Sequence, residues 1–240
     1  MLLLSVSCTV VQYPRAWPDA PPIPPAGATA PVPGKGMAKP LPVPAPREPA
    51  EPRPIPAGEV EDVLEAARRL VGARGPLVVE DRQFPYDCSG YVCAVFYQVG
   101  EELMVLEEGL PLAGMSGTEI IFRRLARENR IFSRDPRPGD LVFFDDTWDR
   151  NGDGELNDTF SHIAVVEESY SDGTVLMLHL GNAGIGRLRM NLSRPTEYKD
   201  ERTGELLNDK LRRLTRRDPD ATPYLTGQLF RAFGRPELTR

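Results

Sequence analysis

The spacing of apolar residues along the chain changes from a helical period to a strand-like one. Between residues 60 and 126, apolar side chains recur three and four positions apart, which is typical of helices that bury one face. Helices are predicted in this half of the chain over residues 60–71, 88–99 and 116–126. Gly72 and Gly100 suit the ends of the first two helices, and Ser116 with Glu119 has the spacing of a capping box.

After Pro136 the pattern becomes one of short apolar runs separated by turn residues. Strands are predicted from these runs over residues 141–144, 163–166, 174–180, 187–192 and 225–233. Residues 191–223 are charged and irregular, with a short helix predicted near Lys210. Helices followed by strands predict the α+β fold class, in which a helical lobe packs on an antiparallel sheet.

Cys88 lies at the predicted start of the second helix. Pro85 prevents the helix from beginning earlier, and the turn Asp87-Cys88-Ser89-Gly90 leads into the apolar stripe. The unpaired N–H groups and the dipole at a helix N-terminus favour a negative charge, and the thiolate is the reactive form of cysteine. The position therefore favours a catalytic nucleophile. The alternative is a buried structural cysteine.

The chain has two histidines, and both lie at predicted strand ends. His162 opens one strand, His179 closes the next, and a hairpin turn at residues 171–173 would bring both to the same side of the sheet. Histidine is the natural base for a cysteine nucleophile because its ordinary pKa is near ~6.5. A second polar residue is then needed to orient the imidazole. The alternative is that both histidines are ordinary strand-end residues.

The segment before His162 matches the first half of an EF-hand calcium loop, with Gly154 at the sharp turn. The candidate ligands are Asp149, Asn151, Asp153, Glu155, Asn157 and Asp158. Position twelve is Phe160 instead of glutamate, so the last carboxylate would come from Asp158 or from residues 145–146. Calcium there would have a structural role, fixing the strand that carries the base. The alternative is a surface turn rich in Asp, Asn and Gly.

Three sequence blocks resemble those of the NlpC-type, papain-like cysteine peptidases of bacterial cell walls. They are DCSGYV, RPGDLVFF and SHIAVV, and the similarity covers roughly residues 60–192. The resemblance implies a papain-like fold with Cys88 as nucleophile at a helix N-terminus, His162 as base and His179 as orienting residue on the sheet. It also implies hydrolysis of amide bonds in the stem peptides of peptidoglycan, with no cofactor needed for the chemistry.

Two alternatives to an NlpC-type peptidase stay open. The related CHAP amidases share the nucleophile, the base and the fold type, but they usually orient the base with a carboxylate or an amide. A protein of another class, a catalytically silent and calcium-stabilised module that binds the cell wall, would keep the fold without a reactive Cys88. The presence of Cys88, His162 and His179 together argues against this last alternative.

Composition adds a tether and a leader to this picture. Sixteen of the 25 prolines fall between Pro14 and Pro56, which predicts an extended tether, or else a disordered tail without a role. The run MLLLSVSC resembles the end of a bacterial lipoprotein signal peptide, so Cys8 would carry a lipid. The alternative is a chance cysteine in a poorly defined leader. The predicted organisation is a leader at residues 1–8, a tether at 9–58 and a hydrolase domain at 59–240 with the calcium-type loop at 145–160.

The net charge of −6 argues against nucleic acid as a partner, because phosphate backbones require a clustered basic surface. The expected partners are peptidoglycan stem peptides and a membrane contacted through the lipid on Cys8. We expect a monomer in the cell envelope, on its periplasmic or extracellular side.

Overall fold

The computed structural model describes residues 52–104, 114–212, 214–215 and 218–238. The helices are α1 (Ala57–Arg69), α2 (Cys88–Gln98), α3 (Gly117–Arg127) and α4 (Thr226–Leu229). The strands are β1 (Leu77–Val79), β2 (Arg82–Phe84), β3 (Ile131–Phe132), β4 (Leu141–Phe144), β5 (His162–Ser169), β6 (Thr174–Gly181), β7 (Gly184–Asn191) and β8 (Phe230–Gly234). All of these described residues belong to one compact unit. The predicted leader, Cys8 and most of the predicted tether lie outside the described residues.

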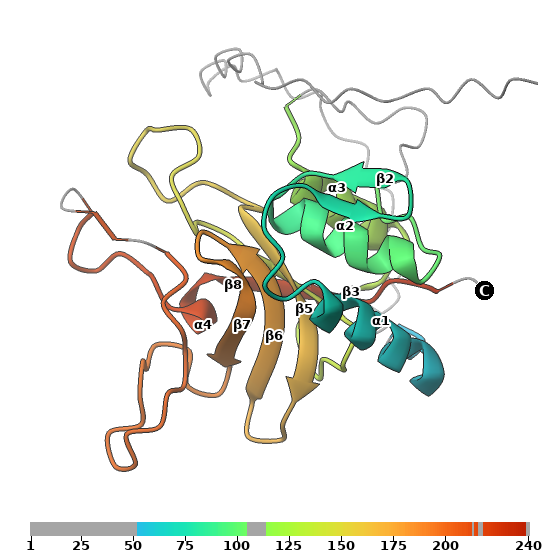
Figure 1. The fold of residues 1–240 in the computed structure, drawn as a ribbon. Helices are drawn as coiled ribbons and strands as arrows, with labels where there is room; N and C mark the ends of the chain where they lie inside the picture. Colours follow the sequence, from blue (N-terminus) through green and yellow to red (C-terminus); the bar gives the residue numbers. More distant parts are fainter. Residues whose placement is uncertain (1–51, 105–113, 213, 216–217, 239–240) are drawn as a thin grey trace, which may run out of the picture. The chain divides into compact units, whose positions relative to one another are not determined.

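The described strands form a sheet of six in the order β3-β8-β4-β5-β6-β7, with β1 and β2 as a separate hairpin. Every neighbouring pair in the sheet is antiparallel. Helices α1, α2 and α3 lie together beside this sheet in Figure 1. The structure therefore confirms the predicted α+β class, with a helical lobe packed on an antiparallel sheet.

Helix α2 is the centre of the larger core. Six consecutive side chains from Tyr91 to Phe96 are buried, so the helix is enclosed on more than the single face that its apolar stripe predicted. Its neighbours are α1, α3, β5 and β6 together with the β1–β2 hairpin. Hydrophobic burial on this scale fixes the start of α2, and with it Cys88, against the sheet.

The opposite face of the sheet has its own apolar cluster, which includes Val142, Phe144, Met177 and Met190. Leu211 packs against this cluster, and Leu211 belongs to the long segment 192–225 between β7 and α4. The sheet is thus covered on both faces, by helices on one and by this segment on the other.

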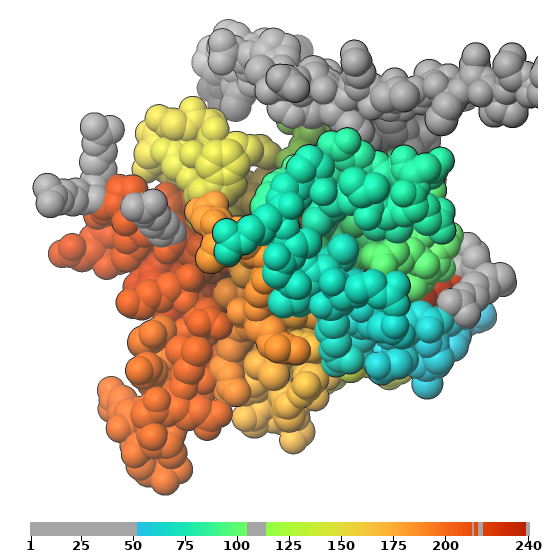
Figure 2. All heavy atoms as spheres, viewed as in Figure 1, coloured from blue at the N-terminus to red at the C-terminus, as the bar shows by residue number. Residues whose placement is uncertain are grey.

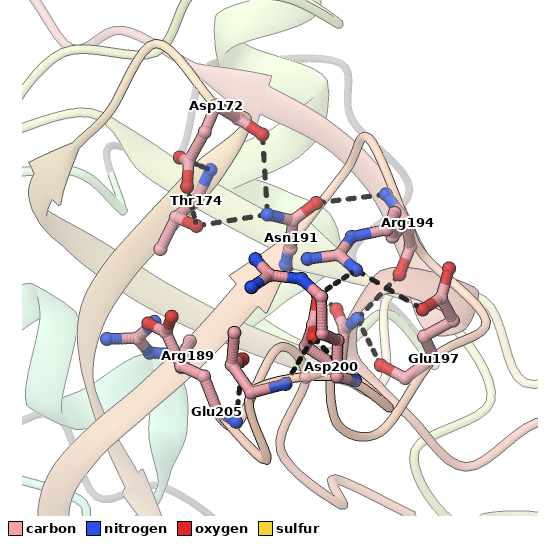
Figure 3. Close-up of polar contacts among 11 residues, drawn as sticks. Asp172, Thr174, Arg189, Asn191, Arg194, Glu197, Asp200 and Glu205 are labelled. Carbon is pink, nitrogen blue, oxygen red and sulfur yellow. Dashed lines mark hydrogen bonds and ion pairs between the residues drawn. The ribbon is translucent and has the colours of Figure 1, made fainter.

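Segment 192–225 is held together by polar side chains more than by secondary structure. Figure 3 shows how the carboxylate and amide groups around Asn191 and Arg194 are paired, and Arg194 bonds Asp200 at 2.6 Å. Asn208, fully buried, accepts from the backbone N–H of Asn191 at 2.8 Å and donates to the carbonyl of Glu197 at 2.8 Å. The predicted helix near Lys210 is not formed. Lys210 instead makes an isolated antiparallel bridge with Leu225.

The described chain begins within the predicted tether. Helix α1 starts at Ala57, and the carbonyl of Pro52 accepts a hydrogen bond from Arg235 Nη1 at 2.7 Å. Arg235 is fully buried and also bonds both carboxylate oxygens of Asp140, at 2.7 and 2.9 Å. These contacts attach residues 52–56 to the domain. In the described part of the chain, no helix has the length and apolar character needed to cross a membrane.

Candidate active site

Cys88 is the first residue of α2, as the sequence predicts. The Asp87 carboxylate caps the helix, since it accepts hydrogen bonds from the backbone N–H of Gly90 and from the Ser89 hydroxyl, both at 2.8 Å. A side chain at Gly90 would place its Cβ only 2.0 Å from the carbonyl oxygen of Pro85. Asp87, Ser89 and Gly90 therefore shape the turn that presents Cys88.

The two histidines meet across neighbouring strands. His162 is the first residue of β5 and His179 lies near the end of β6, and these strands pair antiparallel. His162 Nε2 and His179 Nδ1 are 2.9 Å apart, with the rings nearly perpendicular at 76°. One imidazole must donate to the other in this bond, so the tautomers of the two rings are coupled.

The sulfur of Cys88 lies against the start of the same strand. The backbone of Ile163, the residue after His162, hydrogen-bonds to the Cys88 thiol and lowers its pKa. Among the described residues, the side chain bonded to the sulfur is Thr118, with an Sγ–Oγ1 distance of 3.9 Å, and not His162. Catalytic hydrogen bonds are often long or poorly aligned before substrate binds, so this geometry is compatible with the predicted Cys–His pair.

Burial has a larger effect than the helix N-terminus on the pKa of Cys88, and burial also sets the pKa values of His162 and His179. Burial, together with the nearby Asp87 carboxylate, raises the pKa of the Cys88 thiol to about 11. Burial lowers the pKa of His162 to about 3, with His179 adding to the shift, and burial lowers the pKa of His179 to about 4. At neutral pH the resting site therefore holds a thiol and two uncharged imidazoles, and not the thiolate that the helix position alone favours.

The predicted calcium loop is exposed and folded by its own side chains. Asp149 accepts from the backbone N–H of Gly152 at 2.7 Å and of Gly154 at 3.0 Å, and both glycines have positive φ. Asp153 accepts from the backbone N–H of Glu155 at 2.8 Å and from the Asn157 amide at 2.8 Å. Figure 2 shows the loop, coloured yellow, at the molecular surface.

Asp158 differs from the other predicted ligands because it is buried. It is 2% exposed, and its Oδ2 atom has no hydrogen-bond partner among the residues that the structure describes. Burial raises the pKa of this carboxyl group, and the neighbouring carboxylates of Asp149 and Asp146 raise it further. Among the described residues, the His, Cys, Asp and Glu side chains do not form a group of three already placed around a metal ion. A cation would therefore require the loop side chains to turn from the backbone toward Asp158.

Two residues at the site are not singled out by the sequence patterns. Thr118 contacts the Cys88 sulfur from α3, and a Cβ on Gly181 would lie 2.6 Å from Cε1 of His179. Both contacts depend on tertiary packing. The sequence signals only that Thr118 follows a predicted helix cap and that Gly181 follows a predicted strand.

Residues 79–180 match the family model of the CHAP domain, and this range includes Cys88, His162 and His179. A solved structure described as similar to lipoprotein, NLP/P60 family, from Staphylococcus aureus subsp. aureus Mu50 is 19% identical, with a TM-score of 0.33. That match covers 57% of this chain and 38% of the other, so it spans well under half of that protein's length. The comparison with curated proteins gave no match.

Residues 79–180 are thus similar to the CHAP domain, and this range contains all three of the sequence blocks DCSGYV, RPGDLVFF and SHIAVV. The resemblance inferred from the three sequence blocks is thereby confirmed at this level.

Proposed function

We propose that this protein is a cysteine peptidase that hydrolyses amide bonds in the stem peptides of peptidoglycan. Cys88 would be the nucleophile, His162 the base and His179 the residue that orients the base. The observation that supports this most is the 2.9 Å bond between His162 Nε2 and His179 Nδ1, at the strand end against which the start of α2 packs. This bond leaves the Nδ1 atom of His162 as the one that would exchange a proton with the sulfur.

In the proposed mechanism, proton transfer accompanies attack because the resting thiol is neutral. His162 Nε2–H donates to His179 Nδ1, so His162 Nδ1 is free to take the thiol proton as Sγ attacks the carbonyl carbon. The backbone N–H of Cys88, at the helix start, would donate to the oxyanion. His162 then gives its proton to the leaving amine, and water hydrolyses the thioester to release the carboxylate.

The test is digestion of purified peptidoglycan by the full chain, followed by mass analysis of the released fragments. We expect Cys88→Ala and His162→Ala each to lower the rate by at least ~10³-fold, because the members of a triad act as a unit. Both variants should keep the wild-type unfolding midpoint to within a few degrees. A variant that still digests the wall at the wild-type rate would contradict the assignment.

The same digestion distinguishes the peptidase from a second candidate, a CHAP-type amidase. The match of residues 79–180 to the CHAP family model favours this second candidate. A cut within the stem peptide identifies a peptidase, whereas a free glycan strand with intact stem peptides identifies an amidase. The silent wall-binding module would release nothing, and its Cys88 would not react with a thiol-directed probe.

We also propose that the loop at residues 145–160 binds calcium in a structural role. The support is Asp158, whose buried Oδ2 has no partner and whose carboxyl group is close enough to Asp149 and Asp146 for their charges to raise its pKa. A divalent cation would relieve this repulsion and satisfy the orphaned oxygen. The other ligands would be Asp149, Asn151, Asp153, Glu155 and Asn157.

Calorimetric titration of the protein with calcium alone tests this proposal. We expect a dissociation constant of roughly 10⁻⁴–10⁻³ M, the range of extracellular modules, and a higher unfolding midpoint with calcium. Asp158→Asn and Asp153→Asn should each weaken binding at least ~10-fold, whereas Asp220→Asn, exposed and outside the loop, should leave it unchanged. Absence of heat at millimolar calcium would rule the site out.

For the location of the protein, we propose the cell envelope, with the domain tethered through a lipid on Cys8 and acting as a monomer. The sequence of residues 1–8 and the proline-rich run that follows are its support. Mass spectrometry of the protein from its native host would show an unmodified Cys8 if this is incorrect.

A further inference from the structure

The first turn of α3 meets the first turn of α2 at the predicted nucleophile. Thr118 is 2% exposed, and among the described residues the hydrogen-bond partner of its hydroxyl is the Cys88 sulfur, 3.9 Å away. This contact joins residues 30 positions apart. The hydroxyl is thus a buried polar group whose available partner is the reacting atom.

Gly117 is what lets the two helices come this close. A Cβ on Gly117 would lie 2.5 Å from Ser89 Oγ and 2.9 Å from Ser89 Cβ, so a side chain there would push α3 away from the start of α2. The position of Gly117 is therefore a steric condition for the contact between Thr118 and Cys88.

Ser116 fixes the same turn to the strand that bears the predicted base. Its hydroxyl oxygen accepts from the backbone N–H of Glu119 at 3.1 Å, and the hydroxyl donates to the carbonyl of Phe160 at 3.3 Å. Phe160 lies two residues before His162. The start of α3 consequently contacts both halves of the site, the nucleophile through Thr118 and the approach to the base through Ser116.

We propose that Thr118 is the side-chain hydrogen-bond donor that stabilises the Cys88 sulfur as it becomes negatively charged during attack. This inference rests on the proposed function, to which it adds a residue. A hydroxyl bonded to a buried charged atom gains more than one bonded to a neutral atom, so the contact strengthens as the thiol loses its proton.

The surroundings of the sulfur supply few other means of stabilising charge. At the start of α2, the Asp87 carboxylate opposes the thiolate and the backbone of Ser89 favours it. On β5, the backbone of Ile163 favours the thiolate and His162 is held neutral. On α3, the carboxylate of Glu119 is paired with Arg123 at 2.8 Å. Thr118 is the largest of the influences that lower the pKa of Cys88.

The test measures the rate at which iodoacetamide alkylates Cys88 in the full chain between pH 7 and pH 10. Thr118→Val keeps the shape of the side chain and removes the hydroxyl, so alkylation at each pH should slow by about tenfold. Thr118→Ser keeps the hydroxyl and should restore the wild-type profile. The Cys88→Ala variant measures how much alkylation comes from the other cysteines. If Thr118→Val fails to fold, Thr118→Ala is used instead to remove the hydroxyl.

Alkylation needs no peptidoglycan, so its outcome is separate from that of the proposed function. If Thr118→Val and Thr118→Ala react like the wild type at every pH, Thr118 is only a packing residue and the inference is overturned. If the profile shifts while the wild type leaves peptidoglycan intact, the role of Thr118 stands and the substrate assignment fails.

Discussion

At the scale of single residues, the orientation of His179 depends on the absence of a side chain at Gly181. An added Cβ would lie 2.6 Å from Cε1 and 3.3 Å from Nδ1 of the His179 ring, and Nδ1 is the atom bonded to His162. The ring would have to turn, and this would break the bond that fixes His162. We therefore expect Gly181→Ala to lower the rate of wall hydrolysis by about 10–100-fold, since misplacement of a catalytic group by ~1 Å costs that much.

Gly186 provides the matched control for Gly181. It pairs with His179 on the neighbouring strand, yet a Cβ there meets no atom within 4 Å. Gly186→Ala should hydrolyse peptidoglycan within about twofold of the wild type, with both variants compared at the same folded concentration. Equal rates for the two variants would show that the His179 ring does not need its present position.

The same scale shows what the sequence can and cannot predict about the site. Cys88, His162 and His179 were identifiable because helix starts and strand ends are local features. The protonation states of these side chains are not predictable in the same way. Burial sets the pKa of Cys88, and the elements that bury Cys88 lie far away in the sequence. The thiolate expected at the helix start is correspondingly a neutral thiol in the resting site.

At the scale of elements, length decides which predictions succeed. Strand β4 coincides with the prediction at residues 141–144, and β5 and β6 contain the predicted runs, because each has enough apolar positions to show a pattern. Strand β3 has only two residues and forms by pairing with Phe233 and Gly234. The predicted strand at 225–233 begins with the short helix α4 instead, where Gln228 accepts from the backbone N–H of Leu225 at 3.1 Å.

The segment 192–225 shows the same limit in a longer element. Its order comes from Asn208, which bonds residues 14 and 17 positions away, and from the ion pairs that Arg194 makes with Glu197 and Asp200. The short helix predicted near Lys210 is replaced by an isolated bridge between Lys210 and Leu225. Side-chain networks of this kind follow from the fold and do not appear in the spacing of apolar positions.

At the scale of the whole molecule, the buried histidines make stability depend on pH. Folding lowers the pKa of His162 to about 3 and that of His179 to about 4, so between these values and ~6.5 the unfolded chain binds protons that the native chain does not. The free energy of unfolding should thus be highest above pH ~6.5 and fall as the solution is acidified. From pH 7 to pH 5 we expect a loss of about 2 kcal/mol from His162 and less from the half-buried His179.

Urea unfolding at a series of pH values from 7 to 5 measures this loss. His179→Gln removes one titrating ring while keeping an acceptor for His162, so its stability should fall less over the same range than that of the wild type. The Glu167 carboxylate, whose bonds to Arg187 and Arg68 lower its pKa, contributes to this change mainly below pH ~4.5. Wild-type stability that stays constant from pH 7 to pH 5 would mean that folding does not lower the pKa values of the two imidazoles.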